Sequence, residues 1–169
     1  IAADGGLAHT EKLGIVPNEI LGDFDSLGEI PDHPKTMVYP SVKDDSDMGI
    51  AAKIGLEKGY DRFYIYGATG GDRPEHTVAN LQTLCMLSQK GAKAFIISDN
   101  GTVYTALTEG EAEFQTFAKG YLSIFCMGKE ATGITGVEFN IKINLAQILF
   151  IFCGSRSTKT DSIAKVISA

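Results

Sequence analysis

The chain has 169 residues, enough for one full domain or two small ones. Hydrophobic residues make up 44% and charged residues 21% of it, a balance that is typical of folded globular proteins and excludes an intrinsically disordered chain. The formal net charge of −6 excludes a broad basic surface, so we expect no nucleic acid among its partners.

No basic, hydrophobic leader opens the sequence, and the longest apolar run, residues 148–153, is far shorter than the roughly 20 residues that cross a bilayer. We therefore expect a soluble, cytoplasmic protein with no membrane partner. The cysteines Cys85, Cys126 and Cys153 are odd in number, widely spaced and set among apolar neighbours. This pattern indicates buried thiols instead of a disulfide framework, which fits a reducing cytoplasm.

The first part of the chain alternates short apolar runs with helical segments. Strands are predicted at residues 1–3, 19–21, 37–39, 63–66 and 94–97. Helices are predicted at residues 7–13 and 78–87. A further helix is predicted between an N-cap at Ser46 and a stop at Gly59, and its apolar side consists of Ile50, Ala51, Ile54 and Leu56. This alternation favours a parallel sheet with crossover helices.

The pattern changes after the predicted turn at Asp99-Asn100-Gly101. Short β-type runs follow, separated by glycines, at residues 102–106, 113–117, 121–126 and 139–143. They predict an antiparallel, β-rich second domain. The expected fold class is therefore α/β, with a parallel-sheet domain at residues 1–98 and a β-rich domain at residues 99–169.

Carboxylates gather directly after the predicted strands. They are Asp4, Asp23, Asp25, Asp44, Asp45 and Asp47. Because ligands bind outside the carboxyl ends of the strands in an open α/β sheet, we expect these side chains to converge there. Carboxylates packed together repel one another unless cations neutralise them, and Mg²⁺ commonly bridges carboxylates to the phosphates of a nucleotide. The sequence thus predicts a magnesium and polyphosphate site.

Two further segments suit such a site. If residues 23–25 are extended, Asp23 and Asp25 share one side while Phe24 points into the apolar layer, so both carboxylates could reach one metal ion. The glycine-rich residues 67–71 can present backbone N–H groups to phosphate oxygens, and Arg73 can add a fork of donors.

Each motif alone also has an ordinary structural explanation. Asp-Gly-Gly at residues 4–6 is a common turn, and the acids at 23 and 25 could cap a loop. The acids at 44–47 would favour a helix N-terminus through its dipole. The glycine-rich residues 67–71 lack the P-loop pattern, so their role as a phosphate site depends on the other motifs.

Taken in order, the motifs resemble those of the thiamin pyrophosphokinase family. They are Asp4-Gly5-Gly6, Gly22-Asp23-Phe24-Asp25-Ser26, Lys43-Asp44-Asp45-Ser46-Asp47, Gly67-Ala68-Thr69-Gly70-Gly71, and Glu75-His76 with Asn80. The resemblance implies an α/β nucleotide-binding domain, a β-sandwich-like domain that binds thiamin, and a homodimer. The implied reaction moves the pyrophosphoryl group of ATP to the hydroxyl of thiamin, giving thiamin diphosphate and AMP.

The resemblance also implies roles for single residues. The implied catalytic residues are Asp4, Asp23, Asp25 and Asp47. The implied Mg²⁺ ligands are Asp23, Asp25 and Asp47. The implied ATP-binding residues are Gly5, Lys43, Asp44, Gly70, Gly71, Arg73, Glu75 and His76. Asp47 is in addition expected to orient or deprotonate the thiamin hydroxyl.

The sequence departs from the family pattern in three places, of which the mildest is Ser46, where the family usually has Thr. Residues 71–76 carry an extra residue and have Glu75 where the family usually has Asp, and the chain from Leu145 lacks the family's Ser-Asn-Glu segment, which helps hold thiamin. Two alternatives therefore stay open. One is a pyrophosphokinase for another heteroaromatic alcohol, such as a pterin, and the other is a nucleotide- or thiamin-binding module without turnover.

Overall fold

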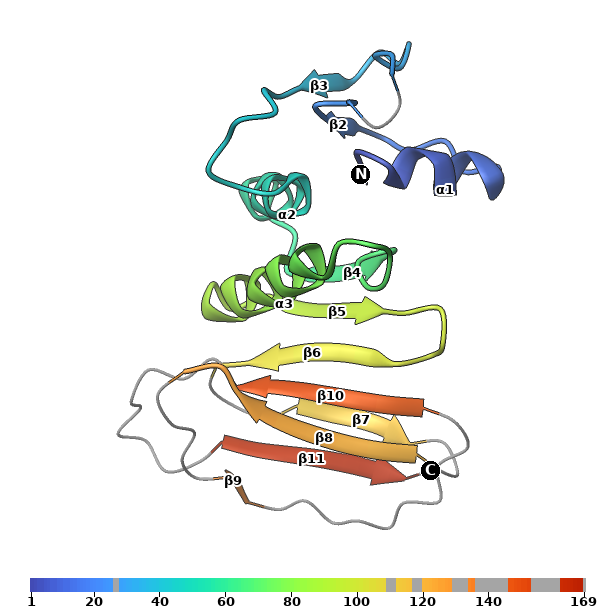
Figure 1. Ribbon diagram of the computed structural model, residues 1–169. Coiled ribbons are helices and arrows are strands. Elements are labelled where there is room, and N and C mark those ends of the chain that lie inside the picture. The colour runs from blue at the N-terminus through green and yellow to red at the C-terminus, as the bar shows by residue number, and fades with distance from the viewer. Residues whose placement is uncertain are drawn as a thin grey trace. The chain divides into compact units, whose positions relative to one another are not determined.

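The computed structural model describes residues 1–25, 28–108, 112–116, 120–128, 134–135, 146–152 and 162–168 (Figure 1). The chain forms two compact units, Ile1–Tyr60 and Asp61–Ala169. The predicted functional division into residues 1–98 and 99–169 stays a prediction. Within the described ranges, no helix is both long enough and apolar enough to cross a membrane.

The first unit is a small parallel sheet with two helices. Its elements are β1 (Ala2–Ala3), α1 (Gly6–Lys12), β2 (Ile20–Gly22), β3 (Thr36–Val38) and α2 (Asp47–Glu57). The strands lie in the order β1-β2-β3 and pair in parallel, so that all three end at the same edge. A buried cluster of Ala2, Leu7, Ile20 and Phe24 packs α1 and the residues after β2 against the sheet. The predicted strands and first helix are confirmed here.

Helix α2 begins and ends where the sequence predicts. The Ser46 hydroxyl accepts a hydrogen bond from the Gly49 N–H at 3.1 Å, and Gly59 adopts a left-handed φ of 83° after the last turn. The predicted buried side is wrong in detail, since the fully buried positions of α2 are Gly49, Ala52 and Gly55. Small residues are buried because they bring the helix backbone close to its neighbours, while the larger apolar side chains stay half-buried.

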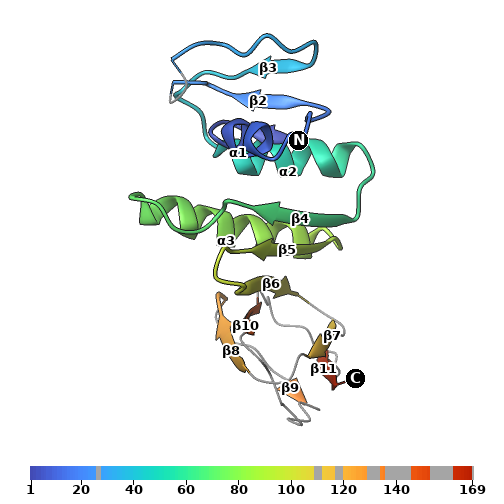
Figure 2. The ribbon, with the colours of Figure 1, turned by 90° about the vertical axis from the view of Figure 1, so that its right-hand side faces the viewer.

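The second unit opens with β4 (Arg62–Tyr66), α3 (Pro74–Gln89), β5 (Lys93–Ile97) and β6 (Val103–Leu107). Strands β4 and β5 are parallel, and β6 returns antiparallel to β5 after the predicted turn. Helix α3 packs against β5 and β6 (Figure 2), with Leu84 and Leu87 fully buried. It starts at Pro74, earlier than predicted, because proline suits the first helical position, where no N–H is needed.

The later strands are β7 (Ala112–Thr116), β8 (Gly120–Cys126), β9 (Ile134–Thr135), β10 (Ala146–Phe152) and β11 (Ser162–Ser168). They complete two sheets, ordered β4-β5-β6-β10-β8 and β7-β11-β9. All described pairs formed by β7 to β11 are parallel, so the antiparallel prediction is wrong for them. The reason is that β10 and β11, from the end of the chain, insert between earlier strands.

The α/β class is confirmed, whereas the predicted run at 139–143 lies outside the described residues.

The prediction of buried thiols is wrong for the two described cysteines, and Cys153 lies outside the described residues. Cys85, on α3, is disulfide-bonded, and Cys126, at the end of the edge strand β8, is a free, exposed thiol. Spacing along a chain does not tell which cysteines meet in space, and an edge strand leaves its last residue open to solvent. The cysteines therefore no longer support a reducing compartment.

Candidate active site

Three carboxylates meet at the edge where β1 and β2 end. Asp4, Asp23 and Asp25, called the acidic triad here, each offer an oxygen, and these oxygens lie within 4.8 Å of one another. Asp4 follows β1, and the other two follow β2. The expected convergence of carboxylates at the strand ends is thus found for these three residues.

The backbone register of the sheet brings the triad together. Ala3 pairs with Leu21 in the parallel ladder, and the Asp4 N–H donates to the Leu21 carbonyl at 2.7 Å. Asp4 therefore lies beside the end of β2, next to Asp23. Parallel pairing places both strand ends at the same edge, which is why residues nineteen positions apart share one site.

The turn after β2 does not have the expected extended form. Phe24 has a left-handed φ of 57°, and its side chain is buried with 2% of its surface exposed. The Asp25 N–H reaches back to Asp23 Oδ1 at 3.3 Å. The left-handed residue tightens the turn, so the two carboxylates still share a site and Phe24 still enters the core, as predicted.

Asp4 is the second left-handed residue of the site, with a φ of 43°. Non-glycine residues in this region cost on the order of 1–3 kcal/mol and persist only when their surroundings hold them there. The two non-glycine residues of the described chain with a left-handed φ, Asp4 and Phe24, thus both belong to the strand ends that carry the triad. The fold therefore stabilises an otherwise unfavourable backbone at this edge.

Gly22, the last residue of β2, passes close to the Asp4 backbone. A Cβ atom added at Gly22 would lie 3.0 Å from Asp4 Cα and 3.2 Å from its N and Cβ atoms. Backbone atoms cannot move aside as a flexible side chain can. Gly22 is therefore required for the approach of Asp4 to Asp23. The sequence analysis missed this role, although a glycine directly before the acidic pair is the signal that could have indicated it.

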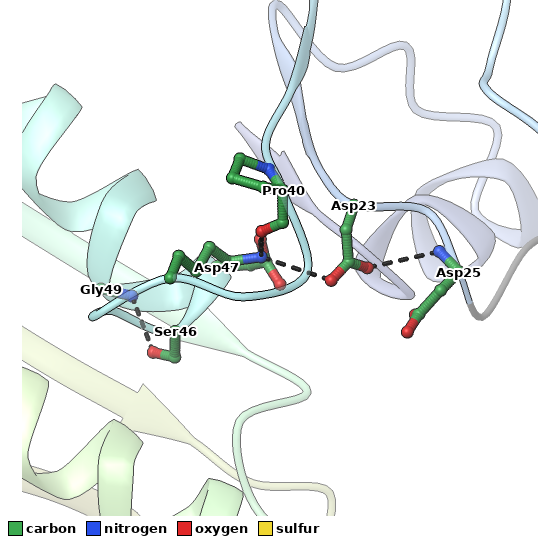
Figure 3. Close-up of polar contacts among 7 residues, drawn as sticks. Asp23, Asp25, Pro40, Ser46, Asp47 and Gly49 are labelled. Atoms are coloured by element: carbon green, nitrogen blue, oxygen red, sulfur yellow. Dashed lines mark hydrogen bonds and ion pairs between the residues drawn. The ribbon is translucent and has the colours of Figure 1, made fainter.

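Lys43 contacts Asp23 of the triad and also Asp47, and Figure 3 labels both of these carboxylates. Its Nζ atom lies 3.4 Å from Asp23 Oδ2 and 3.0 Å from Asp47 Oδ1, and it donates to the Pro40 carbonyl at 3.2 Å. The Asp47 contact is an ion pair without hydrogen-bond geometry, so Asp47 Oδ1 is buried with no hydrogen-bond donor in the described chain. One ammonium group thus partly neutralises two carboxylates from different elements.

The charges of this group shift two pKa values. The Asp25 N–H lowers the pKa of Asp23 most, and Lys43 lowers it further, against the opposing effect of desolvation. For Lys43, desolvation alone would lower the pKa, but the nearby carboxylates of Asp47 and then of Asp23 outweigh it, so the pKa of Lys43 is raised. Both side chains are therefore charged at neutral pH.

The other acids near the triad are placed differently. Asp44 is exposed, and Asp45 pairs with Lys53 instead of joining the triad. Asp47 contacts Lys43 but lies outside the acidic triad, whose third carboxylate is that of Asp4. Gly5 is half-buried and forms the N-cap of α1.

The glycine-rich residues 67–71 belong to the second unit, between β4 and α3. Gly67, Gly70 and Gly71 have left-handed φ values of 66°, 85° and 75°. Arg73 Nε donates to Glu75 Oε1 at 2.7 Å, and both side chains are exposed, as is His76. The predicted nucleotide-binding residues of this unit are thus open to solvent and follow one another along the chain.

Comparison with known proteins shows the family to which the chain belongs. Residues 1–96 match the family model for the catalytic domain of thiamin pyrophosphokinase. The chain is also 30% identical over 158 residues to a thiamine pyrophosphokinase of Bacillus subtilis (strain 168), a match that covers 88% of this chain and 72% of that protein. No solved structure matches significantly. The first two findings show that the chain belongs to the thiamin pyrophosphokinase family.

Proposed function

We propose that the acidic triad and Lys43 form the phosphate-handling part of this enzyme, which transfers the pyrophosphoryl group of ATP to the hydroxyl of thiamin. The observation that carries the assignment is the meeting of Asp4, Asp23 and Asp25 within 4.8 Å. Their mutual repulsion is a cost that folding alone does not require, and it suits a site that binds a cation with a polyphosphate.

The donor set of the triad fits Mg²⁺. It consists of hard carboxylate oxygens, partly open to solvent, and no described histidine or cysteine belongs to the group. Asp4, Asp23 and Asp25 would hold the ion, and Asp47 is close enough to Lys43 to join them if that lysine turns away. When bound, Mg²⁺ would neutralise charge on the transferred phosphates and on the AMP leaving group.

Lys43 and Asp47 would act on the two reactants. The Lys43 ammonium is in position to stabilise negative charge that develops on the phosphates beside Asp23. Asp47 would accept the proton of the thiamin hydroxyl while the hydroxyl oxygen attacks the β-phosphorus of ATP. The bond between that phosphorus and the bridging oxygen to the α-phosphate breaks, and AMP leaves with the electron pair. The proton is then lost from Asp47 to solvent.

The remaining predicted residues would bind the nucleotide. Backbone N–H groups of Gly70 and Gly71 can donate to phosphate oxygens, and the exposed Arg73 fork can add a charged contact. His76 and Glu75 complete this set. Gly5 and Asp44 are proposed as nucleotide contacts of the first unit.

Three wider properties are also proposals. The β-rich strands of the second unit would form the thiamin-binding, β-sandwich-like domain, the active enzyme would be a homodimer, and it would work in the cytoplasm. Light scattering coupled to size-exclusion chromatography tests the dimer directly. A monomer at assay concentrations that retains full activity would contradict it.

The function is tested by AMP release from ATP and Mg²⁺, with and without thiamin. We expect thiamin-dependent AMP release that falls by roughly a thousandfold in the Asp23→Asn, Asp25→Asn double variant, because two neutral amides cannot hold the ion. Asp45→Asn is the matched control, since Asp45 pairs with Lys53 outside the triad. AMP release that depends on a pterin alcohol and not on thiamin would indicate the alternative acceptor. ATP binding without AMP release would indicate a binding module.

A further inference from the structure

A buried amide on α3 holds the glycine-rich residues 67–71. Asn80 lies two turns into α3, with 9% of its surface exposed, and its Nδ2 atom donates to the Ala68 carbonyl at 2.8 Å. Ala68 itself is buried, with 3% exposed, although its neighbours in the segment are more open to solvent. A single residue of the segment is thus fixed against the helix by a short, buried hydrogen bond.

The rest of the segment has little to fix its shape. Gly67, Gly70 and Gly71 have left-handed backbone angles, and beyond the adjacent residues no heavy atom lies within 4 Å of a Cβ added at Gly70 or Gly71. Glycine has more conformations to lose on ordering than any other residue. A segment of this composition presents its N–H groups in a defined direction only if something outside it holds part of the backbone.

We propose that Asn80 is a positioning residue for ATP, which fixes Ala68 so that the N–H groups of Gly70 and Gly71 face the phosphates. The inference rests on the proposed nucleotide-binding role of these two glycines. Asn80 does not contact the substrate in this assignment. Its effect comes from reducing the number of loop conformations that the nucleotide must select, which is an entropic contribution to ATP affinity.

A purely structural role is the competing explanation, since a buried carbonyl without a donor destabilises any fold. The second unit offers a matched control for it. Thr105 on β6 has 5% of its surface exposed, and its hydroxyl donates to the Ala94 carbonyl, also at 2.8 Å. Asn80→Leu and Thr105→Val each remove a buried side-chain donor from a backbone carbonyl while roughly keeping the side-chain volume.

The experiment compares both variants of the full chain with the parent by thermal unfolding, steady-state AMP release, and calorimetric binding of an ATP analogue with a methylene bridge between the α- and β-phosphates. We expect both variants to lose thermal stability. Only Asn80→Leu should raise KM for ATP and weaken analogue binding, by about tenfold, with KM for thiamin unchanged. Hydrogen exchange of residues 67–73 should speed up in Asn80→Leu and not in Thr105→Val. Asn80→Ala, which places a smaller side chain on α3, is used in place of Asn80→Leu if the leucine variant does not fold.

Equal KM values for ATP in the two variants would overturn the inference and leave Asn80 a structural residue. A Gly71→Ala variant separates this failure from that of the proposed function, because its strained backbone disturbs the proposed phosphate contact itself. If Gly71→Ala weakens ATP binding while Asn80→Leu does not, only the positioning role fails. If neither does, the proposed nucleotide site at residues 70–71 fails, and the inference fails with it.

Discussion

The acidic triad and the glycine-rich residues 67–71 are both proposed to bind phosphate, yet they are built in opposite ways. The triad holds three repelling charges on a backbone fixed by the buried Phe24 and by the close approach of Gly22 to Asp4. The glycine-rich segment carries no acidic side chain and is mostly exposed, with one buried amide holding it. Like charges must be held together before a cation arrives, whereas backbone donors can adjust to a ligand.

The largest effect is expected where Gly22 approaches the Asp4 backbone, since this contact fixes the triad. We expect Gly22→Ala to lower the free energy of unfolding by about 1–3 kcal/mol, because its Cβ would meet the Asp4 backbone. Binding of Mn²⁺, measured by calorimetry as a stand-in for Mg²⁺, should weaken by at least about tenfold, since the displaced Asp4 is one of three ligands.

Gly59→Ala is the control for Gly22→Ala. Gly59 also has a left-handed φ, of 83°, but beyond its two chain neighbours no heavy atom lies within 4 Å of a Cβ added there. It should lose on the order of 1 kcal/mol of stability through backbone strain and bind Mn²⁺ normally. If the two alanine variants bind Mn²⁺ equally well, then the Gly22 contact does not set the geometry of the triad.

The next effect concerns Lys43, whose ammonium group contacts both Asp23 and Asp47. Lys43→Met should bind Mn²⁺ several-fold more tightly, because the ammonium that now neutralises Asp23 and Asp47 is gone. Turnover should nevertheless fall by about 10- to 100-fold, because the same group stabilises charge on the phosphates. Lys53→Met removes an exposed partner of Asp45 and should change neither property. Weaker metal binding in Lys43→Met would contradict the idea that lysine and metal compete for Asp23.

Much of the sheet edge that carries the acidic triad, Lys43 and Asp47 could be predicted from the sequence, because it is marked by short motifs of neighbouring residues. An apolar run that ends in Gly22-Asp23 gives a strand followed by carboxylates, and Ser46 before Asp47 gives a capped helix. The contacts that hold these residues could not be read in the same way. The approach of Gly22 to Asp4 and the bridge from Lys43 to Asp23 depend on strand register, which joins residues distant in sequence.

The same limit explains the errors in the second unit. Short β-type runs separated by glycines predicted β6, β7 and β8 as strands, but their pairing depends on β10 and β11, which come from the end of the chain and insert between earlier strands. Direction of pairing is a property of two segments, so a pattern within one of them does not contain it. Asn80 was named among the family motifs, but its hydrogen bond to the Ala68 carbonyl depends on how α3 lies against the glycine-rich segment and was not predicted.

In the glycine-rich region the expected effect of a single charge is smaller. Arg73→Met should raise KM for ATP by up to about tenfold, with kcat changed less, because an exposed guanidinium adds binding but does not hold the site together. Arg62→Met, which removes an exposed arginine from β4, is the matched control. A loss of kcat in Arg73→Met as large as that of the triad variants would show that this region also acts on the transition state.

The smallest expected effect is the pH dependence of stability at the acidic edge. The pKa of Asp23 is lowered in the folded state, so its contribution is present above the unfolded value of about 3.9 and is lost as the pH falls through the folded value. The pKa of Lys43 is raised, so its contribution is present below about 10.4 and is lost as the pH rises through the folded value.

Urea unfolding of the parent and of Lys43→Met across the pH range measures this contribution as the difference between the two proteins. The difference should be nearly constant from about pH 5 to 9, shrink at both extremes, and decrease with added salt, since the pair is partly open to solvent and screened. A difference that instead changes steadily through neutral pH would mean that another titrating group, not the charged pair of Lys43 and Asp23, sets the electrostatics of this edge. The ion pair of Arg73 and Glu75 is far more exposed than that of Lys43 and Asp23, so Arg73→Met should show no comparable loss at either extreme.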